Sequence, residues 1–393
     1  MTIGMMSQGG RRWVRVGQCW DLPAWEAGAK AAREASAGID PRLLVVFASF
    51  SYDLRDLLDG VAEVAGDVPV IGCSTSGEIG PGATLSQGVV VVGFGGDFAV
   101  RTTYATGLQE RARGVGEDVA AALLPLPDTR HGVVLMLTDA LCGDQQEMIR
   151  GAYGILGATV PLIGGGAGDN MRMLTSRQFH GGKIFQDGVV AAHIGTDGPL
   201  GLAIRHGWRC EGPAMVVTAT AGNEVHELDD RPALDVYLDL HHAPAGIERD
   251  APSFAEYALT RPLAIARRGD IAVRHVMGAD PDTRALICAG GVPKGAAAWL
   301  ASGDVESNLA AADAACADAI DGLGGAPLLA LLVFDCAGRR ALLGDDGLMI
   351  EHEAMQRRAG SAALAGFYTY GEVGRIKGVI GFHNQTIVAL ALG

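Results

Sequence analysis

Three stretches of the chain repeat one order of apolar and polar positions. In each stretch an apolar run is followed by apolar residues at helical spacing, and a second apolar run then ends in a glycine-led polar turn. The first apolar runs cover residues 42–49, 132–139 and 328–339. The turns read "GCSTSGE", "IGGGAGDN" and "GFYTYGE". The pattern predicts one strand-helix-strand unit that is used three times.

A further apolar strand is predicted after each turn, at residues 88–94, 188–195 and 385–392. Continuous apolar runs of this length are typical of strands that are buried on both faces. The sequence therefore predicts an α/β fold, in which mixed and mainly apolar β-sheets are flanked by helices.

The segment 201–293 has a different pattern. It predicts a hairpin around "AGN", a helix within "DDRPALDVYLDLHH" and two strands around "ADPDT". The chain of 393 residues is long for a single core. We expect an N-terminal module at 25–200, a connecting hairpin and helix at 201–245, and a C-terminal module at 246–393.

Composition narrows the functional classes. Charged residues make up 19% and apolar residues 49%, which is typical of a globular chain, and the net charge of -14 argues against binding to nucleic acid or an anionic membrane. The uncharged stretches 79–96 and 151–168 contain a proline and many glycines, so no membrane span is predicted.

The seven cysteines form no CxxC motif and their number is odd. Free thiols in a reducing compartment fit this usage better than a disulfide framework, so we expect a cytoplasmic protein.

The turn "GCSTSGE" has the composition of a small-ligand site. Glycine permits close approach of backbone to a ligand, hydroxyl groups supply hydrogen bonds, and a carboxylate suits an ammonium or amide group. Alternatively, Glu78 caps a helix or bonds to neighbouring amides. Nucleophilic catalysis is not expected, because no G-x-S-x-G elbow or local histidine accompanies the turn. The candidate ligand contacts are Cys73, Ser74, Thr75, Ser76 and Glu78.

The other two turns extend the candidate site. "IGGGAGDN" lacks the P-loop Lys-Ser/Thr pair, so tight packing is expected there, with possible ligand contacts nearby. The third turn supplies a second carboxylate. The candidates in these turns are Gly165, Gly166, Asp169, Asn170, Tyr370 and Glu372. We expect the turns at 72–78, 164–170 and 366–372 to lie near one another.

Two further motifs carry polar chemistry near the C-terminus. "HNQT" places His383, Asn384 and Thr386 just before an apolar strand, where they could line a pocket; alternatively His383 is a hydrogen-bonded turn histidine. In "FDCAGRR", Arg339 could bind a carboxylate and Cys336 could be a reactive thiol, or the thiol is simply buried beside solvated arginines.

Metal chemistry has little sequence support. No HExxH motif occurs among the ten histidines, so zinc is not expected. His241 or His242 in "LHHAP" could hold a haem iron, although a histidine pair at a helix end more often faces solvent.

Four motifs in this order, "VIGCSTSGEI", "FDCAGRR", "GFYTYGEV" and "HNQT", resemble the FIST family of intracellular sensory and signal-transduction domains. The resemblance covers the chain from about residue 25 onward and implies two tandem FIST-type modules.

The resemblance also implies a function. It points to a cytoplasmic sensor without enzymatic activity, which binds a small molecule such as an amino acid and signals in trans to a kinase or cyclic-dinucleotide enzyme. Some relatives are haem proteins that sense nitric oxide, so a haem cofactor is an alternative. A cysteine-dependent hydrolase and a protein-interaction adaptor are the remaining hypotheses.

Overall fold

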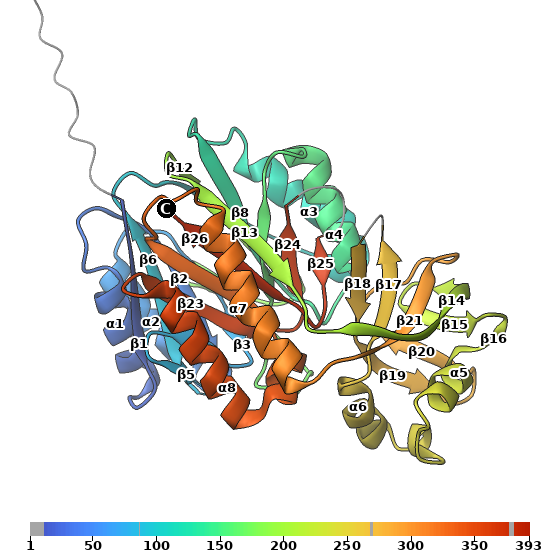
Figure 1. Cartoon of the computed structure of the whole chain (residues 1–393). Helices are drawn as coiled ribbons and strands as arrows, with labels where there is room; N and C mark the ends of the chain where they lie inside the picture. The colour runs from blue at the N-terminus through green and yellow to red at the C-terminus, as the bar shows by residue number, and fades with distance from the viewer. Residues whose placement is uncertain (1–11, 86, 268–269, 377–380) are drawn as a thin grey trace, which may run out of the picture.

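The structure of the protein is a computed structural model that describes residues 12–85, 87–267, 270–376 and 381–393. The described residues form eight α-helices and four β-sheets, of which the three six-stranded sheets are mixed and the eight-stranded sheet is antiparallel (Figure 1). The predicted α/β class is confirmed. Among these residues no helix is both long and apolar enough to cross a bilayer.

The predicted strand-helix-strand unit occurs three times, each time within a larger repeat of eight elements. The first repeat contains β1 (Trp13–Cys19), α1 (Ala24–Ala35), β2 (Pro41–Ser49), α2 (Leu54–Ala65), β3 (Val70–Thr75), β4 (Glu78–Gly80), β5 (Ala83–Leu85) and β6 (Val89–Gly95). The second contains β7 (Ala99–Thr106), α3 (Leu108–Leu123), β8 (His131–Thr138), α4 (Gln145–Leu156), β9 (Leu162–Gly166), β10 (Gln178–His180), β11 (Lys183–Phe185) and β12 (Gly188–Thr196).

The third repeat is interrupted after its first strand. It consists of β13 (Leu200–Arg205), α7 (Val305–Asp321), β22 (Ala330–Cys336), α8 (Ala337–Ala359), β23 (Ala363–Thr369), β24 (Glu372–Arg375), β25 (Phe382–His383) and β26 (Ile387–Leu392).

Each repeat contributes four strands to a six-stranded sheet of its own and its other two strands to a neighbouring sheet. The orders are β1-β6-β2-β3-β10-β11 in the first sheet, β25-β24-β9-β8-β12-β7 in the second and β13-β26-β22-β23-β4-β5 in the third. The glycine-led turn after β3, β9 or β23 is thus the point where the chain leaves its own sheet for a neighbouring one.

The three sheets enclose one common apolar core. Phe47 from the first sheet, Leu135 from the second and Phe334 from the third belong to the same buried cluster. The outer face of each sheet is covered by two helices of its own repeat, as α7 and α8 do in front of the third sheet in Figure 1. This double burial explains the continuous apolar strands of the sequence.

The segment between β13 and α7 forms a second body with its own core. It contains β14 (Arg209–Ala221), β15 (Glu224–Leu228), β16 (Arg231–Pro232), α5 (Ala233–Leu240), a 3-10 turn (Ile247–Arg249), α6 (Ala251–Leu259), β17 (Leu263–Arg267), β18 (Asp270–Arg274), β19 (Val276–Asp280), β20 (Ala285–Cys288) and β21 (Ala297–Ser302).

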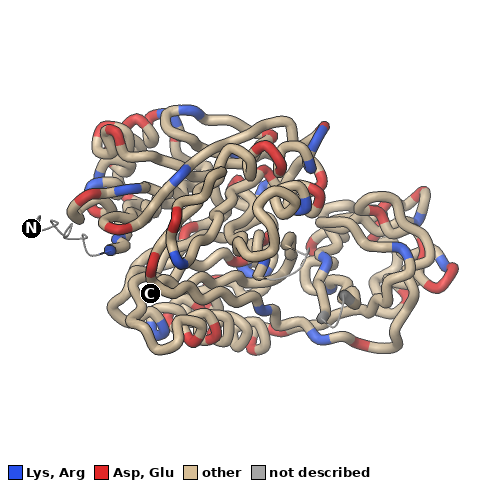
Figure 2. Tube along the Cα trace, turned by 90° about the horizontal axis from the view of Figure 1, so that it is seen from above, with Lys and Arg blue, Asp and Glu red and all other residues tan. Residues whose placement is uncertain are grey.

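We call this second body, residues 209–302, the inserted body. It stands as a separate lobe in Figure 2, which also shows Lys and Arg spread over both lobes among Asp and Glu. The module boundaries that the sequence suggested, near 200 and 245, stay predictions.

Candidate functional site

The three glycine-led turns lie side by side, as the sequence led us to expect. Backbone hydrogen bonds join them in a ring: Gly168 N donates to Ser74 O over 2.9 Å, Ser76 N to Tyr368 O over 3.1 Å, and Gly166 N to the Gly371 carbonyl over 2.8 Å.

The first turn is closed by its own side chains. The hydroxyl of Thr75 is bonded to the Glu78 carboxyl group, whose second oxygen accepts from Gly88 N at 3.0 Å. Gly77 has φ = 121°, a conformation that a residue with a Cβ rarely adopts. Its amide donates to Thr75 Oγ1 over 3.3 Å. The turn therefore satisfies its polar groups internally.

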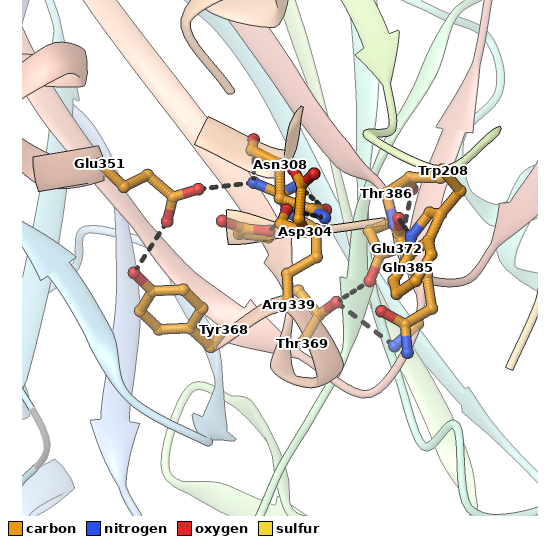
Figure 3. Close-up of polar contacts among 12 residues, drawn as sticks. Trp208, Asp304, Asn308, Arg339, Glu351, Tyr368, Thr369, Glu372, Gln385 and Thr386 are labelled. Atoms are coloured by element: carbon orange, nitrogen blue, oxygen red, sulfur yellow. Dashed lines mark hydrogen bonds and ion pairs between the residues drawn. The ribbon is translucent and has the colours of Figure 1, made fainter. Parts of the chain in front are cut away.

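The third turn reproduces this arrangement. Thr369 Oγ1 donates to Glu372 at 2.7 Å, and the other Glu372 oxygen accepts from the amide and the hydroxyl of Thr386 at 3.1 and 2.8 Å (Figure 3). Gly371 has φ = 130°. The similarity of the two turns in sequence thus reflects a similarity in hydrogen bonding.

Burial changes the protonation of both carboxyl groups. Glu78 and Glu372 are inaccessible to solvent, and desolvation raises the pKa of each from 4.5 to about 8, against the lowering effect of their hydrogen bonds. Both groups are therefore mainly neutral at pH 7.

The second turn uses a different acid. The Asp169 carboxylate accepts from the amides of Met173, Leu174 and Thr175 at 2.8, 2.9 and 3.0 Å and from the Tyr370 hydroxyl. Burial raises the pKa of Tyr370 to about 12, so the phenol remains a donor. Asn170 Oδ1 accepts from Ser49 Oγ at 3.2 Å.

Both candidate thiols, Cys73 and Cys336, are buried. Desolvation raises the pKa of each well above its usual value, which disfavours the thiolate. Ser74 Oγ donates to Gly168 O at 2.7 Å and accepts from Arg177 N at 2.9 Å. Within the described residues, both hydrogen bonds of Ser74 Oγ are to main-chain groups and neither is to a basic side chain.

Arg339 lies in a buried ionic cluster at the carboxyl end of β22. It bonds to Asp335 at 2.6 Å and Glu351 at 2.5 Å, and its third hydrogen-bonding direction meets Asn308 Oδ1 at 2.7 Å (Figure 3). All four side chains are inaccessible to solvent. Arg339 therefore serves carboxylates of the protein itself.

Of the remaining predicted residues, those of the HNQT motif lie beside the third turn and His241 lies elsewhere. His383 pairs with Glu372 in the β24–β25 ladder, and its Nε2 bonds to Gly374 O over 2.8 Å. Asn384 is buried and donates to His383 O. His241 lies in the inserted body, and burial lowers its pKa to about 4. Within the described ranges no group of three metal-ligating side chains was found.

A cavity of about 470 Å³ lies between the second repeat and the inserted body. The second repeat contributes the loop between β8 and α4, and the inserted body contributes β18 and the turns at 222–223 and 288–291. Its lining residues are Gln109, Ala140, Leu141, Cys142, Gly143, Asp144, Gln145, Gln146, Gly222, Asn223, Arg274, Met277, Cys288, Ala289, Gly290, Gly291 and Phe382.

None of the sixteen residues selected from the sequence lines this cavity. It lies at the carboxyl end of β8, a place where open α/β sheets commonly bind ligands. The available sequence signal was the polar segment "TDALCGDQQ" between the strand at 132–139 and the helix after it. The contribution of the inserted body is distant in sequence and left no such signal.

The cavity carries one cationic and one anionic side chain. Arg274 is 2% exposed, and its guanidinium donates to Val273 O and Gly291 O at 2.9 and 3.3 Å, which fixes it in place. Asp144 is exposed and caps α4 by accepting from Glu147 N at 3.0 Å. The amino ends of α3 and α4, marked by Gln109 and Gln145, also reach the lining.

The loop of the cavity is held rigidly. The buried Gln145 side chain accepts from Thr138 Oγ1 at 2.8 Å and donates to the carbonyls of Asp139 and Cys142 at 2.9 and 2.6 Å. Gly143 has φ = 66°, and a Cβ there would lie 2.2 Å from Leu108 O. The main-chain path at Asp144 is thus determined on both sides.

Comparison with known proteins places both halves of the chain in one family. The FIST N domain model matches residues 42–231 and the FIST C domain model matches residues 233–375. An uncharacterized protein of Mycobacterium tuberculosis is 26% identical over 377 residues, covering 92% of this chain and 94% of its own. An uncharacterized protein of Mycobacterium bovis is 26% identical over 394 residues, covering 95% and 97%. One from Methanocaldococcus jannaschii is 24% identical and covers 54% of this chain and 43% of its own.

Proposed function

We propose that this chain, which belongs to the FIST family, is a sensor that binds a free amino acid in the cavity between the second repeat and the inserted body. The proposal includes a cytoplasmic location, to which the seven free cysteines are suited. It also includes signalling in trans to a kinase or a cyclic-dinucleotide enzyme, without catalysis by this chain.

The observation that carries the proposal is the pair of opposite charges in one lining. An α-amino acid has a carboxylate and an ammonium group. The guanidinium of Arg274 suits the carboxylate, and the Asp144 carboxylate suits the ammonium. The amino ends of α3 and α4 add a further preference for a negative group.

Size and location support the same ligand class. A volume of about 470 Å³ falls within the ~300 to 1,000 Å³ typical of small-molecule sites. The cavity also joins two bodies with separate cores, so a ligand that contacts both walls would stabilise one relative arrangement of them. That coupling is what a sensor without catalysis requires.

The haem alternative has less support. Haem iron is usually held by histidine, cysteinate, methionine or tyrosinate. No histidine contributes to the described lining, and burial raises the pKa of Cys288 to about 12. A cysteine-dependent hydrolase also has less support, because it requires a thiolate. Desolvation raises the pKa of Cys142, the other cysteine of the lining, as it does that of Cys288.

Thermal-shift measurements with each of the twenty amino acids, followed by titration calorimetry of those that raise Tm, test the proposal. At least one amino acid is expected to bind the wild-type protein. Asp144→Asn should weaken that binding about tenfold or more, because Asn still caps a helix but lacks the charge that pairs with the ammonium.

Asp53→Asn is the matched control. Asp53 caps α2 in the first repeat by accepting from the amides of Arg55 and Asp56, and it lies outside the cavity lining. It should leave affinity unchanged. The proposal is abandoned if no amino acid binds, or if the two Asn variants bind the amino acid as well as the wild-type protein does.

A further inference from the structure

The loop between β9 and β10 exposes four consecutive residues, Met171, Arg172, Met173 and Leu174. Met171 and Met173 are 40% and 43% exposed, and Leu174 is 78% exposed. Adjacent large apolar side chains on a surface are typical of sites that contact another molecule. Methionine suits such sites because its unbranched thioether side chain adapts to different partners. We call residues 170–174 the methionine loop.

The methionine loop is held in an unfavourable backbone conformation. Asn170, Met171 and Met173 have φ values of 58°, 67° and 56°. Residues with a Cβ rarely adopt this region, and methionine has no side-chain group that favours it. Conformations of this kind persist only where surrounding contacts impose them, and they cluster at functional positions.

The surrounding contacts are visible. The Asp169 carboxylate accepts three amides of the loop segment and is itself bonded by Tyr370. Met171 N donates to Ser76 Oγ at 3.3 Å. All three repeats thus contribute to holding the methionines outward, although the interior would gain more from burying them.

Arginines surround the loop. The guanidinium groups of Arg172 and Arg177 lie 5.1 and 5.7 Å from the ring centre of Phe50. Arg340 of the third repeat donates to Ser76 O, next to the bond that Ser76 makes with Met171. The chain as a whole has a net charge of -14, so a group of three arginines beside one apolar loop contrasts with its acidic composition.

We propose that the methionine loop, with Arg172, Arg177 and Arg340, is the docking surface for a protein partner whose contacting segment is both acidic and apolar. The apolar side chains of that segment pack on the methionines and Leu174, and its carboxylates face the arginines. The inference takes from the proposed function only that a partner exists, since the loop is separate from the cavity lining.

Site-specific photocrosslinking tests the surface without knowledge of the partner. A photoreactive amino acid replaces Leu174 in the full chain, which is expressed in its native host, and crosslinked peptides are identified by mass spectrometry. The control carries the same group at Ile39, which is 88% exposed on the first repeat. A peptide with net negative charge and apolar residues should crosslink from position 174 and not from 39.

Titration of that peptide, synthesised and labelled, against purified variants completes the test. Met173→Ser and Arg172→Glu should each weaken binding about tenfold or more, while Asp144→Asn, which lowers amino-acid affinity in the proposed function, should leave peptide binding unchanged. The side chains of Arg172 and Met173 are both exposed. An unchanged Tm of each of these two variants confirms that it is folded.

Three results would overturn the proposal. These are crosslinks from position 174 to a second copy of this chain, crosslinks to nucleic acid or lipid, and a yield no higher than that from position 39. Peptide binding that is insensitive to both substitutions would overturn it as well.

Discussion

The carboxyl ends of β8 and β22 occupy the same place in two repeats but differ in what fills them. In the third repeat Arg339 occupies the space and joins Asp335, Glu351 and Asn308 in a solvent-inaccessible cluster. In the second repeat the corresponding segment, residues 140–146, lines a cavity of about 470 Å³.

The difference shows how one supersecondary unit can serve stability in one copy and recognition in another. The third repeat supplies its own cation for its own carboxylates, and the whole cluster is inaccessible to solvent. At the second repeat, the cavity lining combines Asp144 of that repeat with Arg274 of the inserted body. A ligand that carries both charges can contact two separate bodies at once, whereas the ionic cluster of the third repeat is enclosed within one body.

The largest effect is expected from disrupting the buried ionic cluster at the carboxyl end of β22. Arg339→Met would leave Asp335 and Glu351 buried without a cation, and loss of one partner of a buried ion pair costs about 3 to 5 kcal/mol. Urea unfolding measures the loss. Arg358→Met is the matched control, because Arg358 and its partner Asp313 are about 40% exposed, and it should cost less than about 1 kcal/mol. Equal losses would contradict the contrast between the two ends.

A pH-dependent effect is expected at the closed turns. The folded protein raises the pKa of Glu78 and Glu372 from 4.5 to about 8, so it retains protons that the unfolded chain releases. Their contribution to stability is therefore fully present below pH 4.5, falls as the pH rises and is lost above pH 8.

Gln imitates the protonated acid, so Glu78→Gln or Glu372→Gln should match the wild-type protein near pH 5. At pH 8 each should be more stable by on the order of 2 to 4 kcal/mol. Denaturant unfolding at a series of pH values measures the difference. A difference that stays constant from pH 5 to 8 would mean that these carboxyl groups are ionised in the folded state.

The cavity loop at the carboxyl end of β8 can be distorted by substitution of a single glycine. Gly143→Ala places a Cβ 2.2 Å from Leu108 O at φ = 66°, so we expect a loss of about 1 to 3 kcal/mol together with weaker amino-acid binding. Gly154 lies within α4 with nothing near its Cβ position, so Gly154→Ala should stabilise by about 0.5 to 1 kcal/mol and leave binding unchanged. Thermal unfolding and calorimetry distinguish the two variants.

The smallest effect is expected from comparing equivalent caps. Asp53→Ala and Asp144→Ala each remove an N-cap, and each should cost about 1 kcal/mol of unfolding free energy. Only Asp144→Ala should also lower amino-acid affinity, because only Asp144 lines the cavity. If both variants bind the amino acid like the wild-type protein, the first and second repeats do not differ in the way proposed.

The repeats could be predicted from the sequence because their signals are local. Apolar runs such as 42–49 and 132–139 and the helical spacing between them depend on neighbours within a few residues. The matching turns at 72–78 and 366–372 were found in the same way, and the structure brings them together. The exchange of strands between sheets was not predicted, because β4 finds its partner β23 nearly 300 residues later.

The sequence by itself determined the α/β class, the threefold repetition of the strand-helix-strand unit and the membership of the family, since each depends on residue order along the chain. The tertiary structure alone decided which polar residues are exposed. The turns richest in hydroxyls and carboxylates are closed by their own hydrogen bonds, as at Thr75 and Glu78. Both bodies line the cavity, so Arg274 and Asp144 reach one lining from distant segments of the chain. Burial and the meeting of distant residues in one lining depend on packing between distant segments, and no local pattern encodes them.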